Sequence, residues 1–148
     1  MTDTHGDGEA NADDDTETRT ETVRRLYERL PLHRALDVHV EEVTEERAVV
    51  TVPFREELVG DPDRGVLHGG ALSTTVDLTG AAVFVGLCGA YTPTVDLRVN
   101  YLEAAPRAPL SATATVERAG TSTGVARVEV VADDTVCATG TGVYRLVD

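Results

Sequence analysis

The sequence predicts an α+β domain in which one long central helix is wrapped by a curved antiparallel β-sheet of about six strands. The segment from Gly69 to Cys88 is apolar or small at nearly every position, and Asp77 is its one charged residue. On both sides of it, apolar and polar residues alternate with the period of two that is typical of strands. A helix that is apolar all round must be covered on all sides, and a curved sheet supplies that cover.

The N-terminal segment differs from the rest of the chain. Residues 1–20 contain seven acidic residues, one arginine and no large apolar residue except Met1. Such a segment buries too little surface to offset its loss of conformational entropy, so we expect an acidic disordered tail. A single domain then covers residues 21–148. From Glu21 on, apolar residues recur at steps of three and four, which predicts a short amphipathic helix ending near Pro31.

Strands follow on both sides of the long helix. Alternation at residues 38–43 and an apolar run at residues 49–52 predict two paired strands. A loop rich in glycine, proline and aspartate, residues 60–65, leads to the long helix. After Pro93 the chain is rich in strand patterns, separated by turn residues. The four expected strands here are residues 94–102, 110–118, 123–131 and 135–146.

Composition bounds the class of protein. The 148 residues carry a net charge of -13, and all 13 basic residues are arginines, with no lysine or isoleucine. This charge argues against nucleic acid or an anionic membrane as the main partner, because both would repel the chain. A GC-rich genome or adaptation to a salty cytoplasm explains the bias. The two explanations are compatible, and together they resemble proteins of salt-loving archaea.

Several functional classes are disfavoured. Polar and acidic residues after Met1 do not form a secretion signal, so we expect a cytoplasmic protein. Two cysteines are too few for a disulfide framework, and the four histidines lack the spacing of a zinc site, so we expect no metal and no cofactor. Cys88 is read as a small buried residue in preference to a nucleophile. A membrane span is the alternative for the long helix, but its serine, threonines and aspartate weigh against it.

Asp77 and the start of its helix are the candidate chemistry. A carboxylate within an apolar helix must be paired, hydrogen-bonded or neutralised. The structural alternative is an aspartate bonded to backbone or to the nearby threonines. The functional interpretation rests on His68-Gly69-Gly70, which begins the same helix. There, free N–H groups and the positive end of the dipole can receive an anion or a developing oxyanion.

Helix geometry then predicts a symmetric dimer. Gly69 and Asp77 are eight residues apart, so they lie about 12 Å apart along one helix at 1.5 Å per residue. Within one chain they cannot act on the same carbonyl carbon. If they work together, the helix start of one subunit must approach Asp77 of the other, which gives two shared sites.

These residues resemble the hotdog-fold acyl-CoA thioesterases of the phenylacetate-degradation (PaaI-like) group. The segment GVLHGGALSTTVD at residues 65–77 carries the family's glycine, His-Gly-Gly and an acid nine residues after the histidine. Residues 94–102, TVDLRVNYL, are similar to the family's strand after the central helix. The likeness covers roughly residues 32–146.

The resemblance implies roles for these residues. It implies that the Gly69 amide polarises the thioester carbonyl and that Gly70, next to it, binds the substrate. Asp77 of the partner subunit would be the general base or nucleophile, and His68 would shape the turn. Thr94 stands where some relatives carry a serine that orients water. The family also implies homodimers with shared sites, often paired into homotetramers as dimers of dimers.

Two departures from the family pattern affect the substrate side. Asp61 stands where many relatives have an asparagine before proline, so it either orients water or only holds the loop. Residues 103–106 replace the more usual Arg-Pro, which leaves the coenzyme A contacts open. Arg64, Arg98 and Arg107 are candidates for the coenzyme A phosphates; the alternative is that they balance an acidic surface.

The sequence thus predicts an acyl-CoA thioesterase that hydrolyses a small or medium acyl- or aryl-CoA to free acid and CoA. The alternative function is a non-catalytic acyl-CoA-binding hotdog protein, which would not need Asp77 together with His-Gly-Gly. A hotdog dehydratase or hydratase is disfavoured, because no acid–histidine pair has the spacing that those enzymes use.

Overall fold

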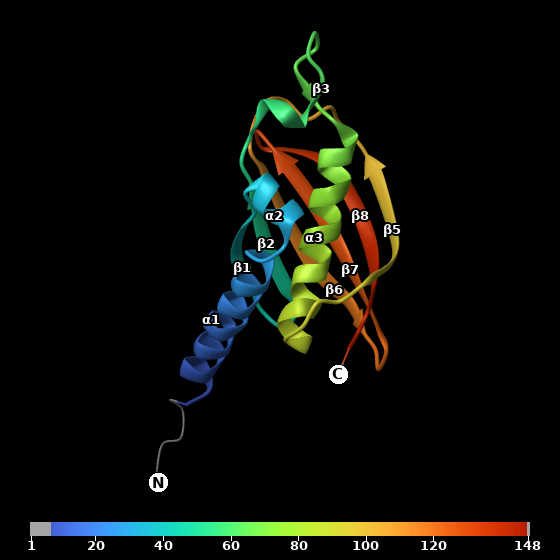
Figure 1. The fold of residues 1–148 in the computed structure, drawn as a ribbon. Coiled ribbons are helices and arrows are strands. Elements are labelled where there is room, and N and C mark those ends of the chain that lie inside the picture. The colour runs from blue at the N-terminus through green and yellow to red at the C-terminus, as the bar shows by residue number, and fades with distance from the viewer. Residues whose placement is uncertain (1–6, 148) are drawn as a thin grey trace.

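The computed structural model describes residues 7–147 and shows the long helix α3 lying across one face of a curved sheet (Figure 1). Within these residues the sheet has six antiparallel strands in the order β1-β2-β6-β7-β8-β5, and β3 pairs with β4 in a separate hairpin. The predicted α+β fold is therefore confirmed. In chain order the elements are α1 (Asp7–Tyr27), α2 (Pro31–Leu36), β1 (His39–Val43), β2 (Arg47–Val52), the 3-10 helix η1 (Glu56–Leu58), β3 (Val59–Asp61), β4 (Val66–Leu67), α3 (Gly69–Cys88), β5 (Thr94–Tyr101), β6 (Leu110–Ala119), β7 (Thr123–Ala132) and β8 (Thr135–Arg145).

The inner face of the sheet is built for close approach of α3. Alternate residues of its central strands point toward the helix, and most of them are small. A Cβ atom added at Gly140 would lie 2.5 Å from Val76 Cγ1 of the helix, so only glycine fits there. Small residues therefore set the helix–sheet distance. The fully buried strand residues include Ala112, Ala114, Ala126, Val128, Val130 and Ala138.

Helix α3 has clear ends. His68 is extended at the N-cap, and Gly89 adopts a left-handed conformation at the C-cap with φ of 68°. By length and composition α3 is apolar enough to cross a membrane, but 61% of its apolar window is buried inside the protein. The core helix expected from the sequence is therefore what the structure shows, in preference to the membrane alternative.

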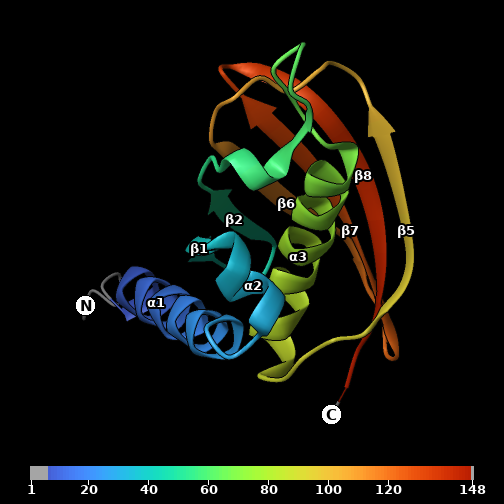
Figure 2. The same cartoon turned by 45° about the horizontal axis from the view of Figure 1, so that its top comes forward.

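The structure corrects the prediction of a disordered tail. Residues 7–20 belong to α1, which runs beside the β1 edge of the sheet (Figure 2); residues 1–6 of the expected tail lie outside the described residues. Thr20 is buried, and its hydroxyl accepts a hydrogen bond from the Val43 N–H at 3.0 Å. The Arg24 Nε donates to the Val40 carbonyl at 2.8 Å. The contacts with β1 come from Thr20 and Arg24 in the C-terminal half of α1, and composition alone does not reveal such contacts with a distant strand.

The helix expected to stop near Pro31 is divided in two. Helix α1 ends at Tyr27, and Pro31 begins the short helix α2. Proline is favourable in the first turn of a helix, because its missing N–H would have no partner there. Helix α2 lies beside α3, next to the C-terminal end of α1 (Figures 1 and 2).

The ordering of α1 predicts a stability effect at Thr20. In Thr20→Val the Val43 N–H loses its partner in a buried place, so the free energy of unfolding should fall by about 1–3 kcal/mol. Denaturant titration measures this change. The matched control is Thr22→Val, because the Thr22 hydroxyl bonds only to Thr18 of its own helix among the described residues. Equal stability of both variants would mean that α1 does not dock on β1.

Candidate active site

The two groups expected to take part in catalysis line separate cavities along α3. The Asp77 cavity, of about 210 Å³, lies beside the middle of the helix and also contains Thr94. The Gly69 cavity, of about 520 Å³, lies at the start of the helix and contains Arg64 and Tyr101. The two cavities share no lining residue. One chain therefore holds the candidate base and the candidate oxyanion donor in different places.

Asp77 has a specific polar partner from another element. Its side chain is half-buried. Asp77 Oδ1 accepts a hydrogen bond at 2.7 Å from the hydroxyl of Thr94, the first residue of β5. The helix threonines are not its partners, because Thr74 and Thr75 donate to carbonyls one turn earlier, those of Gly70 and Ala71. The threonine that binds Asp77 thus comes from another element, and not from the helix itself. Asp77 faces a cavity beside a strand.

Two tyrosines hold the backbone beneath Asp77. The Tyr144 hydroxyl of β8 donates to the Asp77 carbonyl at 2.9 Å, and the Tyr27 hydroxyl of α1 donates to the Leu78 carbonyl at 2.5 Å. Burial raises the pKa of both hydroxyls, and the Asp77 carboxylate raises it further. Both tyrosines therefore stay neutral donors. The turn that carries Asp77 is fixed from two sides.

At the other end of α3, the N-cap residue already uses one amide. His68 Nδ1 accepts a hydrogen bond from the Gly70 N–H at 2.7 Å. That amide is engaged within the N-cap, so it is not free to bind the substrate; that Gly70 contacts the substrate in another way stays a prediction. The Gly69 N–H comes first in the helix, where no preceding helical carbonyl can accept it. Gly69 is thus the better placed oxyanion donor.

The remaining candidate residues lie in the loop before α3 or on the surface of β5. Asp61 Oδ1 accepts from the backbone N–H groups of Asp63 and Arg64, at 3.1 and 3.2 Å. Asp61 therefore holds the turn that precedes β4. Arg64 lines the Gly69 cavity, whereas Arg98 is exposed on β5 and lines neither cavity.

Sequence reasoning missed two residues of the Asp77 cavity. His33 of α2 and Thr92 both line it, and in the described residues the buried His33 Nδ1 and Thr92 Oγ1 have no hydrogen-bond partner. Burial lowers the pKa of His33, and the Asp77 carboxylate acts in the opposite direction. No sequence signal marks either residue, since His33 reaches the cavity only through the placement of α2.

A family match identifies the kind of protein. The profile of the thioesterase superfamily matches residues 64–139, from the loop before α3 to the middle of β8. A protein of Halobacterium salinarum named a putative esterase is 36% identical over 123 residues, which are 75% of this chain and 81% of that protein. The chain belongs to the thioesterase superfamily. The predicted resemblance to hotdog thioesterases and the prediction of a hydrolase are confirmed.

Other relatives of this thioesterase agree in fold and in kind. The medium/long-chain acyl-CoA thioesterase YigI of Escherichia coli is 31% identical over 116 residues, 68% of this chain and 75% of YigI. A solved thioesterase-superfamily structure aligns with a TM-score of 0.84 and 31% identity, over 88% of this chain and 99% of that one. The PaaI protein of the E. coli phenylacetic acid degradation operon aligns with a TM-score of 0.78 at 21% identity, over 90% and 96%, which shows the fold alone.

A metal ion is not supported by the side chains present. Within residues 7–147, no group of three or more histidine, cysteine, aspartate or glutamate side chains is arranged to hold one. That the chain needs no cofactor stays a prediction.

The burial of Tyr144 leads us to predict how the free energy of unfolding changes at alkaline pH. A hydroxyl whose pKa is raised by folding contributes stability below the unfolded value of 10.0, and this contribution is lost as pH rises above it. In Tyr144→Phe the free energy of unfolding should be lower by about 1 kcal/mol at pH 8. Its decline between about pH 10 and 11.5 should be shallower than in the wild type. Tyr91→Phe, at a tyrosine that is 41% exposed, is the control; an unchanged slope in Tyr144→Phe would contradict the prediction.

Proposed function

We propose that this thioesterase hydrolyses acyl-CoA thioesters of small or medium acyl or aryl groups to free acid and CoA. The observation that carries the proposal is the Asp77–Thr94 pair, which faces a largely apolar cavity beside the rigid middle of α3. The name of the relative YigI, a medium/long-chain acyl-CoA thioesterase, supports a CoA thioester as substrate. The Asp77 cavity would receive the acyl group.

Thioester hydrolysis needs two groups on opposite sides of one carbonyl. The Gly69 N–H, at the positive end of the helix dipole, would stabilise the oxyanion of the tetrahedral intermediate. As general base, Asp77 would take a proton from the attacking water. As nucleophile, it would form an anhydride that water then opens. In both cases the C–S bond breaks and CoA leaves as its thiolate.

Strand β5 supports a two-subunit site. It begins with Thr94 in the Asp77 cavity and ends with Tyr101 in the Gly69 cavity. Among the described residues β8 is its one strand neighbour, so its other edge is free to pair. Antiparallel pairing of β5 with its copy about a two-fold axis would place the Thr94 end of one strand beside the Tyr101 end of the other. Asp77 of one subunit would then face Gly69 of the other.

The exposed residues of this segment fit such an interface. Val95 and Tyr101 of β5, and Leu102 directly after it, are 61%, 56% and 54% exposed, which is unusual for large apolar side chains at a sheet edge. A homodimer would cover them. We propose the homodimer as the active unit, with a dimer of dimers as its further assembly.

The two arginines predicted to bind substrate, Arg64 and Arg98, lie in different places. Arg64 lines the Gly69 cavity, so it is the better candidate for a coenzyme A phosphate than Arg98. We place the enzyme in a salt-rich cytoplasm, which the net charge of -13 and the Halobacterium relative support. In molar salt the Debye length is about 3 Å, so the acidic surface would not repel the polyanionic coenzyme A.

Asp77→Asn tests the chemistry. The amide cannot take a proton from water, so kcat for acyl-CoA hydrolysis should fall by about 10²–10⁴ while the oligomer stays folded. A thiol-release assay over an acyl-CoA panel measures the rate, in molar KCl and in low salt. Glu129→Gln, on the outer face of β7, is the control carboxylate. Near-normal turnover of Asp77→Asn would rule out its role, and no thiol release from any wild-type substrate would favour the non-catalytic binding protein.

Mixing two inactive variants tests the shared site. In Gly69→Val the added Cβ would lie 3.3 Å from the Tyr101 ring, and the side chain would block the approach of a carbonyl. Refolding this variant with Asp77→Asn gives heterodimers that contain one intact site if each site uses both subunits. Activity should recover to about a quarter of the wild-type value for random mixing. A site within one chain would give no recovery.

A further inference from the structure

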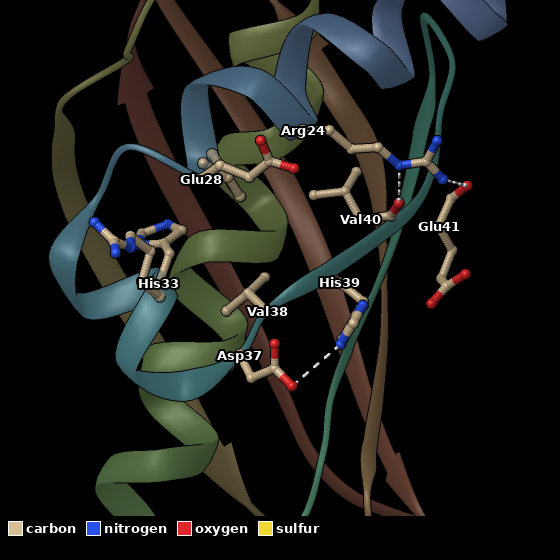
Figure 3. A pocket seen from close by; sticks show the side chains of 10 residues that line it. Arg24, Glu28, His33, Asp37, Val38, His39, Val40 and Glu41 are labelled. Carbon is tan, nitrogen blue, oxygen red and sulfur yellow. Dashed lines mark hydrogen bonds and ion pairs between the residues drawn. The ribbon is translucent and has the colours of Figure 1, made fainter.

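The Asp77 cavity shares one wall with a second, larger hollow. A groove of about 570 Å³ lies between α1, α2 and β1, as the close view in Figure 3 shows. Tyr27 and His33 line both the groove and the Asp77 cavity. These two residues are therefore the partition between them.

The partition is formed by two rings in contact. The Tyr27 and His33 rings meet edge to face, with centroids 4.4 Å apart and an interplanar angle of 75°. Tyr27 is fixed by its hydrogen bond to the Leu78 carbonyl and is 4% exposed. His33 is held less firmly, because it is half-buried on the six-residue helix α2 and its Nδ1 has no partner among the described residues.

The two sides of the partition differ in chemistry. On the cavity side, Leu78, Ala81 and Val85 of α3 offer an apolar wall. On the groove side stand Arg24, Glu28 and Asp37, and Figure 3 shows their charged groups around the hollow. An alkyl chain is stabilised on the first side and gains little on the second. The partition therefore separates an apolar space from a solvated one.

We propose that the Tyr27–His33 pair closes the acyl cavity and sets the longest acyl chain that this thioesterase accepts. The inference rests on the proposed function and names the substrate range of the same site. A cavity of 210 Å³ holds roughly seven groups of the size of water, at about 30 Å³ each. The favoured substrates are therefore acyl groups up to about octanoyl, and longer chains meet the two rings.

The α3 and β5 sides of the cavity give no such exit, whereas Leu32 and Tyr91, at 56% and 41% exposed, form its open mouth. The α3 wall is backed by the core, where Leu78 is buried and Val85 is 2% exposed. Thr92 and Thr94 lead into β5, which is fixed by its pairing with β8. Space beyond the cavity is found behind Tyr27 and His33. A change at His33 is thus the change that lengthens the cavity.

The test is the chain-length profile of kcat/KM from butanoyl- to hexadecanoyl-CoA. In the wild type, kcat/KM should rise to about octanoyl-CoA and then fall by at least about tenfold for hexadecanoyl-CoA. His33→Ala should join the cavity to the groove and lower the octanoyl-to-hexadecanoyl ratio by about tenfold. The octanoyl-to-hexadecanoyl ratio is taken within each variant, so a loss of activity common to all chain lengths does not change it.

Two further variants separate this role from a general loss of structure. His39→Ala removes a side chain that lines the groove alone, so the profile should not change. Ala81→Leu fills the cavity from α3 without touching the partition, so the preferred length should move below octanoyl. It also keeps the inference testable if His33→Ala fails to fold, which circular dichroism detects.

The inference and the proposed function fail in different ways. Hydrolysis with equal kcat/KM for octanoyl and hexadecanoyl groups in the wild type, or an unchanged profile in folded His33→Ala, overturns the inference alone. If no acyl-CoA is hydrolysed, the proposed function fails. Binding of non-hydrolysable thioether analogues then measures the same length limit in Kd, and a Kd that improves steadily to hexadecyl overturns the inference.

Discussion

The burial of α3 against the small residues of the sheet is the contact on which this protein depends. The helix has apolar residues on every face, so it is stable only when a sheet and further helices cover it. Gly140 and the buried alanines of the central strands let it approach closely, and Tyr144 reaches across to the Asp77 carbonyl. The same packing that stabilises the fold therefore fixes where Asp77 stands relative to the sheet and in which direction it points.

A rigid helix also imposes a limit on the chemistry. Its first N–H, at Gly69, and its carboxylate, at Asp77, are held at a fixed separation and open into different cavities. Catalysis that uses both groups must bring them together from two chains. Strand β5 runs from one cavity to the other and carries exposed apolar residues, so a single edge offers both the interface and the alignment of the two half-sites. The proposed dimer and the proposed shared site would then follow from the same geometry as the fold.

The N-terminal helices add a layer beside α3. Helix α1 satisfies the backbone of β1 through Thr20 and Arg24, and it delivers Tyr27 to the side of α3. Helix α2 then places His33 against Tyr27. Helix α1 thus contacts the sheet edge through Thr20 and Arg24 and supplies Tyr27 to the cavity wall.

The sequence by itself determined the elements whose periodicity is strong and local. The apolar segment ending at Cys88, the four strands after Pro93, and His-Gly-Gly with Asp77 identified the fold and the candidate site, because each signal lies within one element. Only the tertiary structure decided that Thr94 is the partner of Asp77, that Gly70 is already bonded to His68, and that residues 7–20 belong to a helix. These contacts join residues through a turn or across distant elements. Their energies depend on packing that no local pattern records.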